Sequence, residues 1–191
     1  MNLPNKLTVL RILLVPVFIV VMMVWRTEAW ATIVGCVIFT VASLTDLFDG
    51  KIARKRGLIT DFGKFLDPLA DKFMVIAALL CIIYRTDAPV FRTVLFIVTM
   101  LVIFRELAVT SIRLVASSSS AHVVIAANKL GKFKTGTQVT CIITMLVEPF
   151  IPFLNQYLIL SYATLACAAV MTVWSGINYM VSYWKFLDPE K

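Results

Sequence analysis

The chain has 191 residues, of which 60% are hydrophobic and only 15% are charged. A soluble domain is usually about 45–50% apolar and about 25% charged, so a water-soluble fold of this size could not bury so much apolar surface. Intrinsic disorder, collagen and coiled coil are excluded as well. The composition indicates an all-α, polytopic membrane protein with a single domain over residues 1–191.

Six apolar segments are each long enough to cross a ~30 Å hydrocarbon core as a helix, since each residue adds ~1.5 Å. They are expected at about 7–25, 29–45, 68–84, 91–115, 135–153 and 157–184. A strand interpretation fails, because the segments are too long for barrel strands and lack their alternation. Arg26 and Glu28 interrupt the first segment before a signal-like cleavage site, so we expect that segment to be retained.

The basic residues are distributed unevenly between the predicted loops. Of 18 Lys and Arg, only Arg26, Arg85 and Arg92 fall in the loops of one side. The positive-inside rule therefore predicts that both termini are cytoplasmic, in a multi-pass protein of the cell membrane. The net charge of +7 then reflects topology and anionic lipid, and no nucleic acid partner is expected. Pro149 and Pro152 predict an outer turn before the last span.

Cysteines and aromatic residues are interpreted as structural. The four cysteines lie in apolar stretches without metal-ligand spacing, so we expect small buried hydrophobic residues and no disulfide framework; they are Cys36, Cys81, Cys141 and Cys167. Aromatic residues near the span ends are typical of membrane-interface belts; these are Trp25, Trp30, Tyr84, Trp174, Tyr179, Tyr183 and Trp184.

Two pairs of aspartates follow one another between residues 46 and 71. Asp46 and Asp49 are three residues apart, and Asp67 and Asp71 are four apart, so each pair shares one face of a helix. Each pair lies at the cytoplasmic end of a predicted span, and the two spans are consecutive. Four clustered carboxylates repel one another unless cations neutralise them. Hard oxygen ligands favour Mg²⁺, Mn²⁺ or Ca²⁺, and the sequence predicts two divalent ions that handle a phosphate or pyrophosphate.

The residues around the aspartates fit a phosphate ligand. Gly50 and Ala53 leave space beside Asp49, and Arg54 offers a forked donor pair for a phosphate. Gly63 clears space before Asp67, and Pro68 is expected in a first helical turn. One aspartate at a membrane interface is commonplace, and nearby lysines and arginines could form an ordinary solvated face. The complete set favours function, because ionisable groups are costly near the membrane.

The pattern Asp46-x₂-Asp49-Gly50-x₂-Ala53-Arg54-x₈-Gly63-x₃-Asp67-x₃-Asp71 resembles the signature of the CDP-alcohol phosphatidyltransferases. The six-span plan is also similar to that family, so the resemblance covers essentially the whole chain. It implies transfer of a phosphatidyl group from a CDP-linked lipid to an alcohol, with release of CMP. It also implies a two-metal site (Mg²⁺ or Mn²⁺) in which the first three aspartates are ligands and Asp71 is both ligand and general base.

Further motifs bear on the acceptor alcohol. The opening Pro4-Asn5-x-Leu7-Thr8-x₂-Arg11 looks like that of bacterial phosphatidylglycerophosphate synthases within the family. So do Arg105-Glu106 with Arg113, and Gly131-Lys132-x-Lys134-Thr135. This resemblance implies CDP-diacylglycerol as donor and glycerol 3-phosphate as acceptor. Asn5 and Thr8 would help to bind the CDP-lipid; Arg11 is equally well explained as an interfacial anchor.

Physical chemistry agrees with a phosphorylated acceptor. Arg105 and Arg113 are about 12 Å apart along one helix, and an arginine as deep as Arg105 is costly without a partner. Glu106 is one candidate partner. Together with Lys132, Lys134 and Thr135 the two arginines are expected to form a basic lobe beside the aspartates. Alternatively, Lys132 and Lys134 are ordinary positive-inside residues, and the Arg113 side chain extends to the membrane surface.

Other hypotheses remain open at this stage. Another enzyme of the same family would use inositol phosphate, serine or phosphatidylglycerol as acceptor. A divalent-cation transporter would instead place its charges near the membrane midplane, within inverted repeats. A purely structural membrane subunit is a third hypothesis. Pairing of two copies into a homodimer is common among small enzymes of this family, and the sequence does not decide it.

Overall fold

The computed structural model describes residues 3–56, 61–118, 129–155 and 157–183; within these ranges, the side chains of residues 3–4, 47–56, 61–65, 115–118, 129 and 155 are outside the description. The described chain is helical and has no strand. Its long helices are α1 (Leu3–Val24), α2 (Ala29–Arg56), α3 (Asp61–Arg85), α4 (Pro89–Ser118), α5 (Lys129–Val147) and α7 (Ile159–Tyr183). A 3₁₀ turn at Glu148–Phe150 and the short helix α6 (Pro152–Asn155) separate α5 from α7.

The all-α prediction is confirmed for the described residues, and each predicted span overlaps a long helix. The fifth, expected at 135–153, extends past the end of α5 at Val147. Four helices are long and apolar enough to cross a membrane, over Asn5–Val24, Ala29–Asp46, Pro89–Leu114 and Ile159–Tyr183. The passage of α3 and α5 through a bilayer, and the cytoplasmic position of the termini, stay predictions. The turn expected around Pro149 and Pro152 is confirmed, since α5 ends at Val147.

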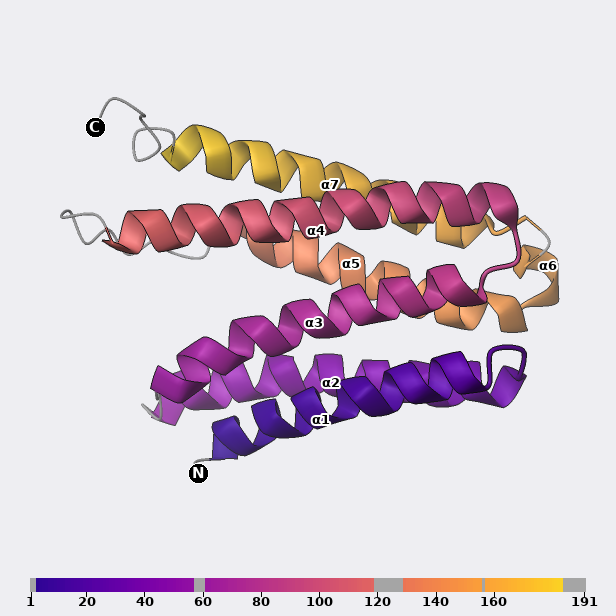
Figure 1. Ribbon diagram of the computed structural model, residues 1–191, viewed down its shortest axis with the longest axis horizontal. Helices are drawn as coiled ribbons and strands as arrows, with labels where there is room; N and C mark the ends of the chain where they lie inside the picture. Colours follow the sequence, from indigo (N-terminus) through magenta and orange to yellow (C-terminus); the bar gives the residue numbers. More distant parts are fainter. Residues whose placement is uncertain (1–2, 57–60, 119–128, 156, 184–191) are drawn as a thin grey trace.

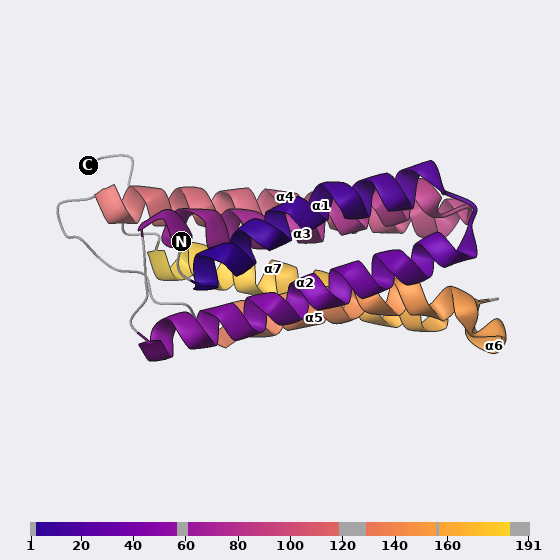
Figure 2. The same ribbon diagram turned by 90° about the horizontal axis from the view of Figure 1, so that it is seen from below.

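The long helices form an antiparallel bundle (Figure 1). α1, α3 and α5 begin at the same end of the bundle where α2, α4 and α7 end; we call this the site end, and the opposite one the far end. α1 packs along both α2 and α3, while α7 packs against α4 and α5. Figure 2 shows α2 and α5 lying along one side of the bundle. Every long helix therefore has one terminus at the site end.

The expectation for Pro68 is wrong. α3 begins at Asp61, so Pro68 lies inside the helix and not in its first turn. Proline has no backbone N–H, and the helix therefore lacks one hydrogen bond at this point. The prediction failed because it started the helix where the apolar span starts, whereas the polar segment before the span is already helical.

The outer surface of the bundle is apolar. Large side chains such as Leu107, Phe153 and Val181 are exposed along several helices. An exposed apolar surface of this extent marks contact with lipid. All four cysteines are free, as expected, and Cys81 and Cys141 are buried. The expectation of burial is wrong for Cys167, which is exposed on this surface.

Close packing joins α1 to its neighbours. A Cβ atom on Gly35 of α2 would lie 2.5 Å from Met22 Sδ, so a side chain there would displace Met22 from the contact between α1 and α2. At the far end, Arg85 of α3 donates hydrogen bonds to the carbonyl oxygens of Met22 and Trp25, at 3.0 and 2.8 Å. The Met22 carbonyl is one of the last four of α1, which have no helical partner, and the Trp25 carbonyl follows the end of that helix.

Glu148 fixes the start of α7. Its buried carboxylate accepts hydrogen bonds from the backbone N–H groups of Leu160 and Ser161, at 2.9 and 2.8 Å, and from the Ser161 hydroxyl. The first N–H groups of a helix have no partner within it, and their partial positive charge favours a carboxylate. Glu148 therefore ties the turn after α5 to the beginning of α7.

We predict that Glu148→Gln destabilises the protein by about 1–3 kcal/mol, because the amide replaces one accepting oxygen with a donor group and removes the charge. Thermal unfolding in detergent would measure the loss. Glu28→Gln is the matched control, since Glu28 is exposed at the same end of the bundle. Equal unfolding temperatures for the two variants would contradict the capping role.

Candidate active site

The first helix contacts the carboxylates of both following helices. Arg11 and Thr8 lie one turn apart on α1, and each is only 1% exposed. Arg11 Nη1 lies 2.8 Å from Asp46 Oδ1 on α2. Thr8 Oγ1 donates a hydrogen bond of 2.5 Å to Asp67 Oδ1 on α3. Asn5, one turn before Thr8, is buried on the same helix. Two residues of the N-terminal motif, Thr8 and Arg11, therefore contact the aspartates.

The structure describes three of the four signature aspartates at the site end. Asp71 lies one turn after Asp67 on α3, close enough to Asp46 for their charges to interact. The backbones of Asp49, Gly50, Ala53 and Arg54 continue α2, and that of Gly63 lies near the start of α3. The side chains at these five positions are outside the described residues, so their expected roles stay predictions.

The chemistry of the carboxylates suits a hard divalent cation. Asp46, Asp67 and Asp71 offer only oxygen donors, the type that Mg²⁺ and Mn²⁺ prefer. Among the side chains that the structure describes, no three His, Cys, Asp or Glu residues by themselves form a group able to hold a metal ion. The expected ligand set includes Asp49, whose side chain is not among those described. Arg11 and Thr8 contact two of the three described carboxylates.

A second group of charges surrounds Glu106 of α4. Its carboxylate accepts a hydrogen bond from Lys134 of α5, and Arg105 Nη1 lies 3.1 Å from Glu106 Oε1. Lys72 of α3 lies 4.0 Å from Glu106 Oε2 and donates a hydrogen bond to the Thr110 hydroxyl. We call Lys72, Arg105, Glu106 and Lys134 the Glu106 cluster. Lys134 is also in electrostatic range of Asp71, which places this cluster beside the aspartates.

Arg113 contacts α7 instead of Glu106. Its Nη2 donates a hydrogen bond of 2.6 Å to the hydroxyl of Tyr179. The guanidinium carbons of Arg113 and Arg105 lie 5.3 and 5.7 Å from the centroid of the Tyr179 ring. Tyr179 is 2% exposed, so the interpretation of this residue as part of an interface belt is wrong. The α4–α7 packing buries it, and its ring contacts both arginines.

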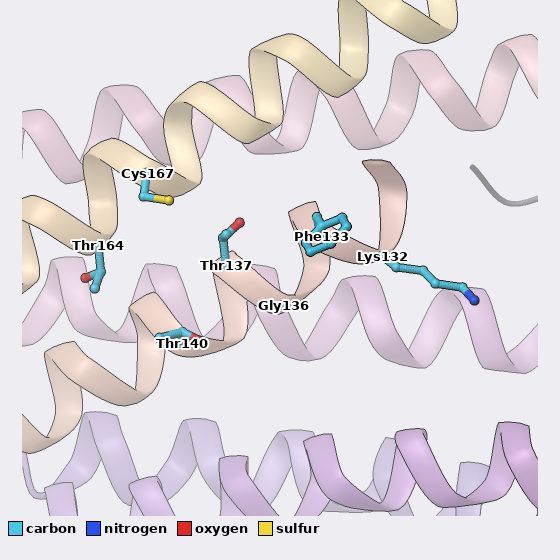
Figure 3. Close-up of a pocket in the computed structure, with 7 residues that line it drawn as sticks. All are labelled: Lys132, Phe133, Gly136, Thr137, Thr140, Thr164 and Cys167. Carbon is cyan, nitrogen blue, oxygen red and sulfur yellow. The ribbon is translucent and has the colours of Figure 1, made fainter. Parts of the chain in front are cut away.

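The remaining residues of the predicted basic lobe lie apart. The Thr135 hydroxyl donates to the Gly131 carbonyl oxygen within α5, at 3.2 Å. Lys132 is exposed and, two residues from Lys134, lies on nearly the opposite side of the helix. It lines a groove of about 460 Å³ between α5 and α7 (Figure 3). The other lining residues are Phe133, Gly136, Thr137, Thr140, Thr164 and Cys167. The structure thus joins Arg105 and Lys134 through Glu106, while Lys132 is not part of that cluster.

Neither Lys72 nor Tyr179 is recognisable as a site residue from the sequence pattern used above. Lys72 carried a usable signal, because a lysine inside an apolar span is costly unless it is paired. Tyr179 carried none, since an aromatic residue near a span end is typical of an interface belt. Its role follows only from the contact between α4 and α7.

Comparison with known proteins identifies the class of this site. The family model described as CDP-alcohol phosphatidyltransferase matches residues 1–174. The chain belongs to this family. Membership gives the class of enzyme expected from the aspartate pattern, and it leaves the transporter and structural-subunit hypotheses without support.

Several relatives in the family match nearly all of the chain. The CDP-diacylglycerol–glycerol-3-phosphate 3-phosphatidyltransferase of Bacillus subtilis (strain 168) is 40% identical, over 97% of each chain. The protein of the same name from Yersinia enterocolitica is 34% identical, over 99% of each chain. A cardiolipin synthase (CMP-forming) from Oryza sativa subsp. japonica is 35% identical over 98% of this chain and 59% of its own length.

We predict that Arg11→Met costs about 1–2 kcal/mol of stability, because it leaves the carboxylate of Asp46, whose side chain is 35% exposed and so partly solvated, without its buried partner. Adding Asp46→Asn should recover most of this loss, since neither charge then remains. Both effects are measured by thermal unfolding. Lys6→Met, an exposed position on the same helix, is the control. A double variant no more stable than Arg11→Met would contradict the pairing.

Proposed function

We propose that the chain transfers the phosphatidyl group of CDP-diacylglycerol to glycerol 3-phosphate, giving phosphatidylglycerophosphate and CMP. The observation that carries the proposal is the position of the Glu106 cluster beside the aspartates, at one end of the bundle. The carboxylates suit the metal-bound diphosphate of a CDP-lipid, and the cations suit an acceptor that carries its own phosphate. The names of the relatives in Bacillus subtilis and Yersinia enterocolitica support this pair of substrates.

The proposed topology places this chemistry at the cytoplasmic face of the cell membrane. Six long helices would cross the bilayer. Four of them are apolar enough by themselves, and α3 and α5 would be the other two. Since α1 begins and α7 ends at the site end, both termini would share its side of the membrane. The concentration of lysine and arginine in the loops of that end favours the cytoplasm. A homodimer stays a prediction.

Two divalent ions, Mg²⁺ or Mn²⁺, are proposed at the aspartates. Asp46, Asp49, Asp67 and Asp71 would hold them. When bound, they would stabilise the negative charge that develops on the attacked phosphate and on the leaving group. Arg54 would contact a phosphate of the CDP-lipid, while Gly50, Ala53 and Gly63 leave room for it. Asn5 and Thr8 would position the donor from α1.

The acceptor would be oriented by the cations and activated by a carboxylate. Arg105, Arg113 and Lys134 would bind the phosphate of glycerol 3-phosphate, with Lys72 beside them. Asp71 is within electrostatic range of both Asp46 and Lys134, and it would take the proton of the attacking hydroxyl. The acceptor oxygen then forms a bond to the phosphorus that bears diacylglycerol. The bond from that phosphorus to the bridging oxygen of the diphosphate breaks, and CMP leaves with that oxygen.

Purified protein in lipid nanodiscs, supplied with CDP-diacylglycerol and a panel of alcohols, tests the function through release of CMP. We expect glycerol 3-phosphate to be used at least about tenfold more efficiently than serine, inositol phosphate or phosphatidylglycerol. The similarity to a rice cardiolipin synthase makes phosphatidylglycerol the most informative competitor. If phosphatidylglycerol were the preferred substrate, glycerol 3-phosphate would not be the acceptor. If no alcohol in the panel supported CMP release, the proposal would be contradicted.

Asp71→Asn should reduce CMP release by at least about 10²-fold, because general base catalysis contributes about 10²–10⁴-fold. Treatment of the wild type with EDTA should abolish turnover, and added Mg²⁺ or Mn²⁺ should restore it. Asp87→Asn is the matched control, since Asp87 lies at the far end and pairs there with Arg26. Full activity of Asp71→Asn would exclude this residue as the base, and full activity after chelation would exclude the metal site.

A further inference from the structure

Tyr179 lies where the two arginines of α4 meet α7. Arg105 and Arg113 are eight residues apart, which is about 12 Å along the helix axis. The one buried ring nevertheless contacts both guanidinium groups, at 5.7 and 5.3 Å from its centroid. Two positive groups so arranged repel each other. The negative face of the aromatic ring offsets part of that repulsion and gives both groups a fixed surface.

The hydroxyl and the helix beside it add to this surface. The Tyr179 hydroxyl accepts a hydrogen bond of 2.6 Å from Arg113. One turn earlier on α7, a Cβ atom on Gly176 would lie 3.3 Å from Arg105 Cγ, so the stem of Arg105 lies directly against α7. The ring of Tyr183 stacks on that of Tyr179, with centroids 5.8 Å apart. α7 therefore restricts both arginine side chains without neutralising them.

Donor capacity remains on Arg105. Its Nη1 contacts Glu106, but its buried Nε has no hydrogen-bond partner among the residues that the structure describes. A buried donor without a partner is costly, and a ligand oxygen would remove that cost. The arginine is thus held in place by an aromatic ring and still has a hydrogen-bond donor for an anion.

We propose that Tyr179 is a positioning residue for the phosphate of the acceptor: it holds Arg105 and Arg113 at the spacing in which both guanidinium groups can bind one phosphate. The inference rests on the proposed function, since it requires an acceptor with a phosphomonoester. An arginine side chain loses conformational freedom when it binds a ligand. Tyr179 restricts the two side chains before the acceptor arrives, and the affinity for that phosphate rises accordingly.

The test separates the hydroxyl from the ring. Tyr179→Phe removes only the hydrogen bond to Arg113, whereas Tyr179→Leu also removes the aromatic face. With CDP-diacylglycerol held constant, we expect the KM for glycerol 3-phosphate to rise at least about tenfold in Tyr179→Phe, because a hydrogen bond to a charged group is lost. A larger rise is expected in Tyr179→Leu. The kcat and the KM for CDP-diacylglycerol should stay within about twofold of wild type in Tyr179→Phe.

Two further variants complete the design. Tyr162→Phe is the matched control, because Tyr162 lies on the same helix at the far end and its ring contacts Phe91. Its kinetic constants should equal those of wild type. In an Arg113→Met background, Tyr179→Phe should raise the KM no further, since the hydroxyl then has no guanidinium to orient. An unchanged KM in Tyr179→Phe would overturn the inference, as would an equal loss in kcat and in both KM values.

Equilibrium binding of glycerol 3-phosphate distinguishes this inference from the proposed function. A wild-type protein that binds glycerol 3-phosphate and releases no CMP would contradict the proposed function. The inference would then be decided by whether Tyr179→Phe weakens binding by the expected factor. A wild type that uses glycerol 3-phosphate, with a Tyr179→Phe variant that binds it equally well, would overturn the inference alone. A wild type that neither binds nor uses it would overturn both.

Discussion

The ion pair between Arg11 and Asp46 is the contact on which the site end depends. Ionised groups buried beside a lipid-facing bundle must be paired, because their desolvation is otherwise uncompensated. α1 meets this requirement for two helices at once, since Arg11 pairs with α2 while Thr8 donates to Asp67 of α3. The first helix thereby holds carboxylates together that would repel one another. The N-terminal motif that contains Thr8 and Arg11 therefore also has a structural role, besides the ligand binding that the family resemblance implies for it.

Charge is arranged differently at the two ends of the bundle. At the far end, Arg85 and Glu148 satisfy the backbone groups of α1 and α7, which is a purely structural use of charge. At the site end, side chains of opposite sign come from several helices. Carboxylates from α2 and α3 lie on one side, and cations from α3, α4 and α5 gather around Glu106. Such an excess of ionisable groups is costly, and a ligand that they share explains it.

The sequence predicted the helices well and the contacts between them poorly. Apolar segments predict the spans, because side chains that face lipid must be apolar. They do not predict how far a helix continues beyond the lipid into polar sequence. α5 begins at Lys129, whereas its span was expected from residue 135. Lys132 and Lys134 were therefore grouped in one basic lobe, although the helix directs them to nearly opposite sides. Tyr179 and Lys72 were not predicted as site residues for a related reason. Their partners are on other helices, and no spacing within the sequence encodes those pairings.

The charge balance of the Glu106 cluster bears on the kind of acceptor. Lys72, Arg105 and Lys134 contribute three positive charges and Glu106 one negative charge, and Arg113 beside them adds a further cation. The cations therefore outnumber Glu106 by three. A phosphomonoester carries about −1.5 to −2 at neutral pH and compensates more of this surplus than the single charge of a phosphodiester does. A net-neutral alcohol such as serine would leave the whole surplus uncompensated. Because unpaired charge is expensive in a buried site, this balance favours an acceptor with a terminal phosphate.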